Sequence, residues 1–318
     1  MIFLLNRKRN MTKILFIGGA GFIGSNLIKV LIKDDYDIHV CEPVNASLHR
    51  LQGLDVKIHN CSLTDIALVS DVIKQNNIDI VVHLVSMLIP GSTYDDYKEE
   101  YKHVIFPSIE LMEICAEVGV KFVYFSSGGT VYGNRNDVLP FTETDAMNPI
   151  SYYGWSKQMM ENSIQFMHRT KGLKYLILRP SNPYGHGQNL YGKQGLVAVA
   201  IGRVLKNEAV EVWGDGSAVR DYIFIDDLAI VFKQLMNIDV INETLNIGSG
   251  RGYSVNDVLA FLKIISHEDF RIEYKNPRSV DVSNMVLDLS RLKHYVNYEF
   301  TPFMEGIKQF YNESLTNQ

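Results

Sequence analysis

Short apolar runs alternate with helical stretches over residues 13–179 of this 318-residue chain. The runs are rich in Ile, Val, Leu, Phe and Tyr and mostly lack polar alternation, which is typical of strands covered on both faces. We expect strands at 13–18, 37–42, 55–59, 79–84, 121–126 and 174–179, and helices near 22–33, 65–76, 95–118 and 152–171. Such β-α-β units with right-handed crossovers predict an α/β fold with a doubly wound parallel sheet.

The pattern changes after Arg179. Pro, Gly and Asn punctuate residues 181–188 densely enough to predict a loop, and shorter elements follow, with a helix near 195–207 and a strand at 210–213. We therefore expect the sheet domain at 11–180 and a smaller C-terminal α/β lobe at 181–318, with parts of 222–248 returning to the first domain. A catalytic cleft between the two is the default expectation.

The N-terminal residues and the composition argue against a secreted, membrane-spanning or nucleic-acid-binding protein. Residues 1–10 are expected to be a disordered extension, since positive charge follows the apolar residues 1–5, the reverse of a secretory signal, and Met11 is an alternative start. The chain has no run of about 18 apolar residues, so we expect no membrane-spanning helix. The net charge of −5 disfavours nucleic acid and anionic lipid as partners.

The three cysteines, Cys41, Cys61 and Cys115, stand far apart without a CxxC pair or a neighbouring His cluster. This spacing favours a reducing compartment and argues against a disulfide scaffold or a zinc module. We therefore expect unpaired thiols, no metal and a cytoplasmic location.

A glycine-rich segment, Gly18-Gly19-Ala20-Gly21-Phe22-Ile23-Gly24, follows the first expected strand. Glycine is needed where the backbone turns tightly and lets a pyrophosphate approach the N–H groups of a helix N-terminus. The alternative is a plain strand–helix turn. The position directly after the first strand of a β-α-β unit favours dinucleotide binding.

Glu42 ends the second expected strand, at the distance where a carboxylate meets the ribose hydroxyls of adenosine. A carboxylate there repels a 2′-phosphate, so the sequence favours NAD over NADP. Glu42 could instead be an ordinary solvated strand end, and Arg50 nearby keeps NADP open.

Tyr153 and Lys157 share one face of the expected helix 152–171, because they are four residues apart. A free tyrosine has a pKa of about 10, and lowering it to about 7 needs about 4 kcal/mol. The lysine ammonium, helped by a positively charged nicotinamide, is a plausible source. A surface Tyr–Lys pair is the alternative. The place after the fifth strand, where a nicotinamide is expected, favours an acid/base role.

Together these motifs resemble those of the extended short-chain dehydrogenase/reductase family, the NAD-dependent nucleotide-sugar epimerases and dehydratases, over nearly all of residues 12–290. Further matching segments are 82–84, 126–133, 179–182, 214–222, 226–229 and 246–248. The resemblance implies an NAD-binding Rossmann domain, a nucleotide-sugar lobe and a homodimer. It implies NAD contacts at Gly18, Gly21, Phe22, Ile23, Gly24, Glu42, Leu84, Ser126, Tyr153, Lys157 and Pro180.

The resemblance also implies roles in the reaction. Tyr153 acts as acid/base on the sugar 4-hydroxyl, and Lys157 binds the nicotinamide ribose and tunes Tyr153. Nucleotide-sugar contacts fall on Asn182, Leu196, Arg220, Arg278, Asp281 and Met285. A guanidinium such as Arg220 suits a diphosphate because it forms paired hydrogen bonds, although a surface Arg220–Asp221 ion pair is the alternative. The bulky Met285 favours plain hexoses over N-acetylated ones.

The chain departs from the family pattern at Gly128, where epimerases usually carry a serine whose hydroxyl contacts the sugar 4-oxygen. Ser127, Thr130 or a water must replace it. Dehydratases place Thr-Asp-Glu where this chain has Gly128-Gly129-Thr130, which disfavours dehydration. Two cofactor contacts of the family are also altered: Ser62-Leu63 stands where Asp-Ile or Asp-Leu is usual beside adenine, and Val104 replaces an expected Asn.

The sequence therefore predicts an NAD-dependent nucleotide-sugar 4-epimerase, acting on a UDP-hexose by transient oxidation at C4. The main alternative is an NAD(P)H-dependent reductase of a nucleotide-linked 4-keto sugar, which Gly128 favours. A non-catalytic nucleotide-sugar or NAD sensor is a third possibility, disfavoured by the presence of both Tyr153 and Lys157.

Overall fold

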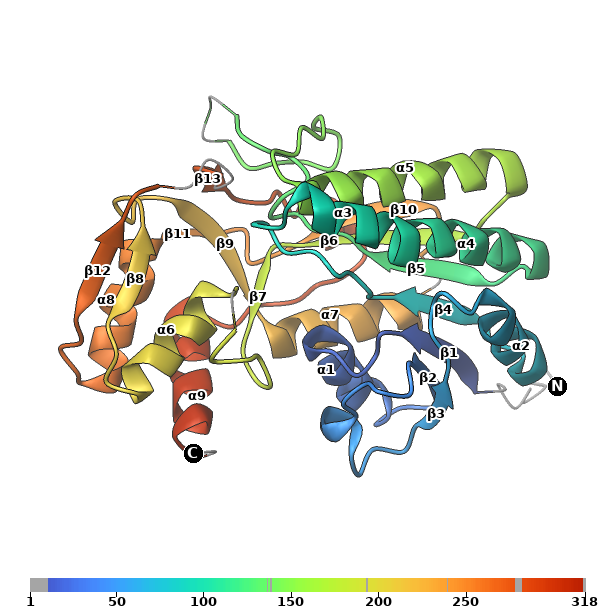
Figure 1. Ribbon diagram of the computed structural model, residues 1–318, viewed down its shortest axis with the longest axis horizontal. Coiled ribbons are helices and arrows are strands. Elements are labelled where there is room, and N and C mark those ends of the chain that lie inside the picture. Colours follow the sequence, from blue (N-terminus) through green and yellow to red (C-terminus); the bar gives the residue numbers. More distant parts are fainter. Residues whose placement is uncertain are drawn as a thin grey trace, which may run out of the picture.

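A computed structural model of the chain describes residues 11–135, 137, 139–192, 194–238, 240–277 and 282–316 (Figure 1). The expected extension at 1–10 lies outside these residues. Over the described ranges, no helix combines the length and the apolar character needed to cross a membrane. The same ranges hold no group of three or more His, Cys, Asp or Glu side chains placed to bind a metal ion.

A seven-stranded parallel sheet forms the larger part of the molecule and confirms the predicted doubly wound α/β fold (Figure 1). Its order is β10-β6-β5-β4-β1-β2-β3. The strands are β1 (Thr12–Ile17), β2 (Tyr36–Glu42), β3 (Lys57–Asn60), β4 (Ile80–His83), β5 (Lys121–Phe125), β6 (Tyr175–Pro180) and β10 (Glu243–Ile247). All of the neighbouring pairs run parallel.

Helices cover both faces of this sheet, which is why its strands are apolar throughout. One face packs against α1 (Phe22–Leu31) and α7 (Ile225–Asn237), and the other against α2 (Ile66–Asn76), α4 (Phe106–Val118) and α5 (Tyr152–Lys171) (Figure 1). Because alternate side chains of a strand point to opposite faces, Phe16 belongs to the first core cluster and Leu15 to the second.

The expected single helix 95–118 has three parts in the structure. It begins as α3 (Tyr94–Glu100), continues as a π-helical turn, η2 (Tyr101–Ile105), and ends as α4. Thr93 and Asp96 form a capping box at its start, which satisfies the first backbone N–H groups. The π turn, with its i→i+5 hydrogen bonds, widens the helix directly after Glu100.

The smaller lobe is built around a short sheet in which β9 (Val219–Phe224) pairs with β7 (Asn182–Tyr184), β11 (Gly252–Ser254) and β13 (Asn284–Met285). A second ladder joins β8 (Val210–Trp213) to β12 (Ile272–Lys275). Phe303 packs against Tyr184, Tyr222 and Tyr253 in the core of this lobe. The remaining elements are α6 (Leu196–Leu205), α8 (Val255–Ser266), α9 (Phe303–Thr316), η1 (His49–Leu51) and η3 (Leu292–His294).

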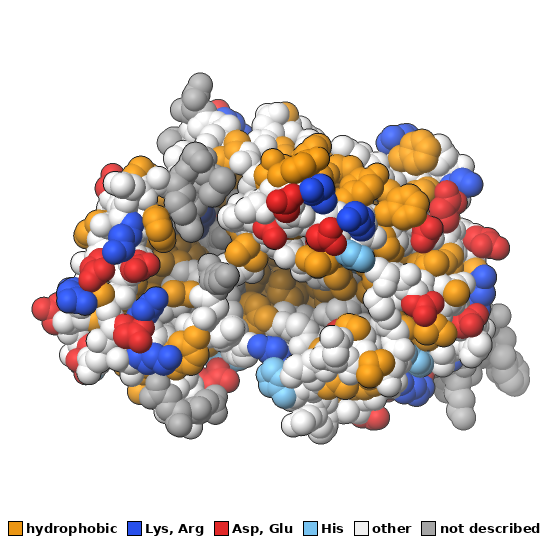
Figure 2. Space-filling view, in the orientation of Figure 1, with side chains coloured by type: hydrophobic (Ala, Val, Ile, Leu, Met, Phe, Trp, Pro, Cys, Tyr) orange, Lys and Arg blue, Asp and Glu red, His pale blue; other side chains and the backbone are white. Residues whose placement is uncertain are grey.

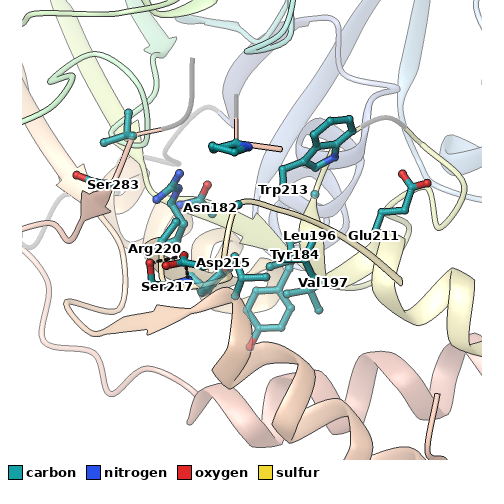
Figure 3. A pocket seen from close by; sticks show the side chains of 18 of the residues that line it. Asn182, Tyr184, Leu196, Val197, Glu211, Trp213, Asp215, Ser217, Arg220 and Ser283 are labelled. Carbon is teal, nitrogen blue, oxygen red and sulfur yellow. Dashed lines mark hydrogen bonds between the residues drawn. The ribbon is translucent and has the colours of Figure 1, made fainter. Parts of the chain in front are cut away.

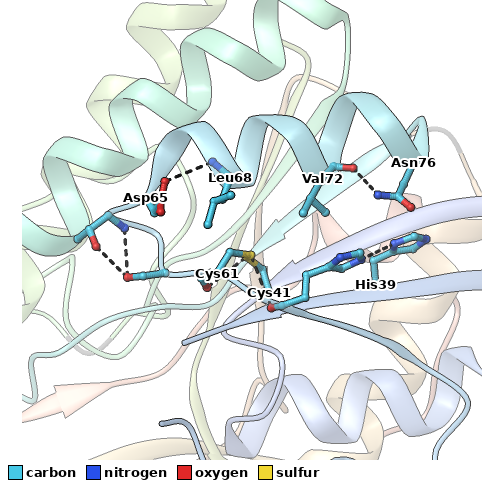
Figure 4. Close-up of a disulfide and its surroundings, with 10 residues drawn as sticks. His39, Cys41, Cys61, Asp65, Leu68, Val72 and Asn76 are labelled. Atoms are coloured by element: carbon cyan, nitrogen blue, oxygen red, sulfur yellow. Dashed lines mark hydrogen bonds between the residues drawn. A yellow bond between two sulfur atoms is a disulfide. The ribbon is translucent and has the colours of Figure 1, made fainter. Parts of the chain in front are cut away.

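Cys41 and Cys61 form a disulfide, so the expectation of unpaired thiols is wrong for these two residues (Figure 4). The neighbouring parallel strands β2 and β3 end side by side, which brings the two Cα atoms to 5.5 Å, within the range that a disulfide spans. Helix α2 lies over the pair (Figure 4). Cys115 is free and buried.

Protein purified without reductant should therefore show one titratable thiol in denaturant, that of Cys115, rather than three. The bridged residues are 20 positions apart, and closing a loop of that length restricts the unfolded chain by about 3 kcal/mol. Adding reductant should lower the free energy of unfolding in urea by about that amount. A Cys115→Ser variant is the control and should show no thiol; finding three thiols in the parent chain would contradict the assignment.

Candidate functional site

Most of the predicted site residues lie along one edge of the large sheet, where its parallel strands end. Gly18 follows β1, Leu84 follows β4 and Ser126 follows β5, while Glu42 and Pro180 close β2 and β6. The strand order reverses between β1 and β4. In doubly wound sheets, ligands bind outside the strand ends at such a reversal.

The glycine turn between β1 and α1 lets other groups come close to its backbone. Gly18 has φ +82°, and a Cβ there would stand 2.8 Å from Val85 Cγ2. A Cβ on Gly24 would come within 2.6 Å of the Gly19 carbonyl oxygen, so the helix can pack against the turn only if that residue is glycine. Gly21 is the N-cap of α1 and is exposed. This bare helix N-terminus, with Phe22 and Ile23 in its first turn, can receive a pyrophosphate.

A cavity of about 270 Å³ adjoins the turn. Glu42 lines it and is buried; its Oε1 accepts a hydrogen bond from the Ala20 N–H at 2.6 Å, and burial raises the pKa of the carboxyl. Ser62 and Val104, the two altered positions, also line this cavity. The Arg50 guanidinium donates to the Gly187 carbonyl at 3.0 and 3.2 Å and so holds the loop after β7.

Tyr153 and Lys157 project from the first turns of α5, which starts at an N-cap serine, Ser151. The Lys157 ammonium is buried and donates to the Phe125 carbonyl at 3.0 Å, at the end of β5. Its Nζ lies 5.5 Å from the centre of the Tyr153 ring. The phenol of Tyr153 forms a hydrogen bond with Ser127. The structure thus brings together three of the four predicted catalytic residues, Tyr153, Lys157 and Ser127.

Burial dominates the ionisation of this pair. It raises the pKa of Tyr153 to about 12, against the lowering effect of the Ser127 hydrogen bond, and it lowers the pKa of Lys157 to about 8. Burial outweighs the lowering by Ser127 in the pKa of Tyr153, and the expected lowering by the Lys157 ammonium stays a prediction. A positively charged nicotinamide is a further source of such a shift.

Position 128 has no room for the missing serine. A Cβ on Gly128 would lie 2.6 Å from Leu287 Cδ1 and 2.9 Å from the Arg179 carbonyl oxygen. The Leu287 side chain therefore fills the space. Nearby, the Thr130 Oγ1 and Ser181 Oγ atoms are buried without a hydrogen-bond partner among the described residues. Thr130 thus has a hydroxyl group to spare for a ligand, whereas that of Ser127 is engaged with Tyr153.

A second cavity, of about 370 Å³, lies in the C-terminal lobe (Figure 3). The predicted residues Asn182, Leu196 and Arg220 line it together with Trp213 and Ser283. The sequence reasoning missed Trp213 and Ser283. The alternation of β8, in which Val210 and Val212 are buried and Trp213 is not, could have indicated the tryptophan. Figure 2 shows the molecular surface hollowed between the two lobes.

Asp221 lies in the interior rather than at the surface, where the alternative interpretation of Arg220-Asp221 placed it. Its carboxylate is fully buried and accepts hydrogen bonds from the Ser249 N–H at 2.8 Å, the Ser249 hydroxyl at 2.9 Å and the Gly250 N–H at 3.1 Å. Its carbonyl oxygen accepts from Asn182 Nδ2 at 2.8 Å. Asp221 therefore organises the strand that presents Arg220 to the cavity.

Of the remaining predicted substrate contacts, the structure describes Met285 but not Arg278 or Asp281. Met285 pairs with Arg220 between β13 and β9, but its side chain is fully buried in a small core cluster with Leu287. Its influence on sugar choice stays a prediction. Arg278 and Asp281 lie outside the described residues.

The model of the NAD dependent epimerase/dehydratase family matches residues 14–248, about three quarters of the chain. The chain belongs to this family. The match runs from β1 to the end of β10 and so contains the glycine turn, Tyr153, Lys157 and Arg220.

Individual relatives agree with that assignment. A putative UDP-glucose 4-epimerase of Methanocaldococcus jannaschii is 32% identical over 303 residues, which cover 94% of this chain and 97% of the relative. A dTDP-4-dehydro-6-deoxyglucose reductase of Escherichia coli is 28% identical and covers 87% of this chain and 89% of the relative. The crystal structure of the Thermotoga maritima UDP-glucose 4-epimerase with UDP-glucose superposes with a TM-score of 0.90 at 33% identity, covering 96% of this chain and 99% of that one.

NAD is the cofactor of the family, which confirms the sequence prediction. The residues present fit it: side chains at Gly18 and Gly24 would close the turn, and a cavity containing Glu42 continues from it. Glu42, Leu84 and the glycine turn would hold the cofactor on one side of the sheet edge, and Lys157 and Tyr153 on the other.

The Gly128→Ser variant should be less stable than the parent chain by about 1–3 kcal/mol, because the added atoms overpack against Leu287 and a backbone oxygen. Combining it with Leu287→Ala should cost less than the sum of the two single changes. Urea unfolding measures all three variants. Gly91→Ser is the control, since a Cβ there meets nothing within 4 Å. Strict additivity would contradict the contact.

Proposed function

We propose that this chain is a nucleotide-sugar 4-epimerase that acts on a UDP-linked hexose. The observation that carries the proposal is the meeting of Tyr153, Ser127 and Lys157 at the carboxyl edge of an NAD-type sheet, with an arginine-lined cavity in the adjoining lobe. The full-length similarity to UDP-glucose 4-epimerases supports it.

In this proposal each residue has one task. Arg220 and Asn182 anchor the diphosphate, so that the sugar stays in the cleft throughout the reaction. Tyr153 takes the proton of the sugar 4-hydroxyl and later returns it, with Ser127 holding the phenol in place. Thr130 offers its free hydroxyl to the sugar in place of the missing serine. Bound NAD supplies reversible oxidation at C4.

A reductase of a nucleotide-linked 4-keto sugar is the second candidate. Gly128 favours it, since the hydroxyl that epimerases use is absent and Leu287 fills its place. The similarity to the Escherichia coli dTDP-4-dehydro-6-deoxyglucose reductase points the same way. The two candidates share the acid/base pair and differ in whether the cofactor is regenerated within one turnover.

Three further expectations are retained as proposals. We place the NAD-binding domain at 11–180 with returns from 222–248, and the substrate lobe in the rest. We propose a homodimer formed through the helical face of α3 to α5, where Tyr101, Phe106 and Phe166 are exposed. Figure 2 shows hydrophobic side chains gathered over these helices. The cytoplasmic location rested on unpaired cysteines, and with Cys41 and Cys61 bridged it stays a prediction.

Purified protein incubated with UDP-glucose and no added cofactor should produce UDP-galactose, because an epimerase regenerates its own bound NAD. Chromatography of the nucleotide sugars measures the product. Consumption of NAD(P)H with a 4-keto sugar and no epimerisation would instead support the reductase. Failure to turn over any nucleotide sugar would leave only a binding protein.

The Tyr153→Phe variant should lose at least about 100-fold in kcat, since it removes the group that transfers the proton. The phenyl ring keeps the packing, so bound NAD should remain at the parent level. Tyr152→Phe, the neighbouring tyrosine on the same helix, is the matched control and should stay within about twofold. Near-parental turnover of Tyr153→Phe would refute the acid/base role.

A further inference from the structure

A buried carboxylate beside the catalytic helix is not accounted for by the roles above. Glu100, the last residue of α3, is 1% exposed. Its Oε1 accepts hydrogen bonds from the Ser86 hydroxyl at 3.0 Å and the Ser156 hydroxyl at 3.1 Å, and its Oε2 accepts from the Met87 N–H at 2.7 Å. Removing a carboxylate from water is costly unless its oxygens are satisfied in this way.

These donors belong to two different segments of the chain. Ser86 and Met87 lie in the loop after β4, and Met87 lines the cavity next to the glycine turn. Ser156 lies in α5, directly before Lys157. Glu100 therefore ties one wall of the cofactor cavity to the helix that carries Tyr153 and Lys157.

The local backbone is arranged around this residue. The helix changes from α to π geometry at Tyr101, immediately after Glu100. Single π turns inside α-helices are frequent at functional sites, because they change the direction of side chains on the helix. An expected continuous α-helix over 95–118 would not have this irregularity.

Glu100 also contributes charge to the site. Ionisable side chains from four elements interact with the Lys157 ammonium. Electrostatic interactions link it to Glu100 from α3, Glu161 from α5 and His83 from β4. The rings of Tyr153 from α5 and Tyr124 from β5 lie beside it. Glu161 is already paired with Arg179 of β6 at 2.6 Å. His83 is neutral, since burial lowers its pKa to about 3. The donors to Glu100 are all uncharged, so among the described residues its negative charge, together with that of Glu161, acts on the ammonium.

We propose that Glu100 is a positioning residue for the reaction proposed above: its carboxylate fixes the loop after β4 against α5 and keeps a negative charge near the Lys157 ammonium. The inference rests on the proposed function. It adds a residue outside the Tyr153–Lys157 motif to the machinery that sets the protonation of that motif.

The direction of the effect follows from the sign of the charge. The negative charge of Glu100 raises the pKa of both Lys157 and Tyr153. Replacing it with a neutral group should lower both values. In the loaded enzyme, the pH at which Tyr153 becomes a base and the pH at which Lys157 loses its proton should both move toward acid.

The test is the Glu100→Gln variant of the NAD-containing enzyme. Its profile of kcat against pH should shift to lower pH by about one unit on both limbs. Glu99→Gln is the matched control: the neighbouring carboxylate is exposed and pairs with Lys102 at 3.0 Å, and its removal should leave the profile unchanged. An unshifted Glu100→Gln profile would overturn the charge role.

A second measurement does not depend on turnover. Dialysed Glu100→Gln protein should release NAD about tenfold faster than the parent, because the loop after β4 loses a charge-assisted hydrogen bond. If Glu100→Gln does not fold, the Ser86→Ala variant removes one hydrogen bond from the loop after β4, while the Ser156 hydroxyl and the Met87 N–H still satisfy the carboxylate and keep its charge. It should release NAD faster without any shift of the pH profile.

If both variants release NAD at the same rate as the parent protein, the positioning role is wrong. The proposed function fails separately, if the parent enzyme turns over no nucleotide sugar. In that case NAD release still decides whether Glu100 fixes the loop.

Discussion

The burial of one ammonium group organises the centre of this molecule. Lys157 is 4% exposed, and a charge in that position must be compensated by oxygen atoms. Its hydrogen bond to the Phe125 carbonyl holds the start of α5 against the end of β5. Because Tyr153 stands one helical turn earlier on the same face, this single contact also fixes the phenol at the edge of the sheet.

The neighbouring side chains extend this compensation across three elements. Arg179 of β6 forms a buried pair with Glu161 of α5, and the Ser126 hydroxyl donates to the same carboxylate. Ser126 is thus held from within the protein, at the position where the sequence predicted a cofactor contact. Breaking such a pair leaves an unpartnered buried charge, which costs far more than the pair gains when it is intact. The network therefore sets where the strands may end relative to α5, and so shapes the cleft.

The sequence was informative where the determining contacts are local. Apolar runs predicted six of the seven strands of the large sheet to within a few residues, but not β10. Strand ends predicted Gly18 and Glu42 at one edge, because parallel strands must end together. Contacts between distant segments were not predictable in this way. The Cys41–Cys61 disulfide requires two strand ends to be neighbours, and the fit of Leu287 into the space at Gly128 joins residues far apart in the chain. Likewise, nothing in residues 95–118 signalled a π turn after Glu100.

The absence of a serine hydroxyl at position 128 has a smaller effect on the kind of reaction than the anchoring of the substrate has. A single neutral hydrogen bond contributes about 0.5–1.5 kcal/mol, so its loss costs about tenfold in rate and leaves proton transfer by Tyr153 intact. An epimerase and a reductase of a 4-keto sugar both need that transfer. What separates them is whether the cofactor is regenerated within one turnover, which in an epimerase requires the oxidised sugar to stay bound until it presents its other face. If Arg220 and Asn182 anchor the diphosphate as proposed, that residence depends on them, in a lobe whose sheet is organised by the buried Asp221. On this proposal, the C-terminal cavity contributes to the choice between the two activities together with position 128.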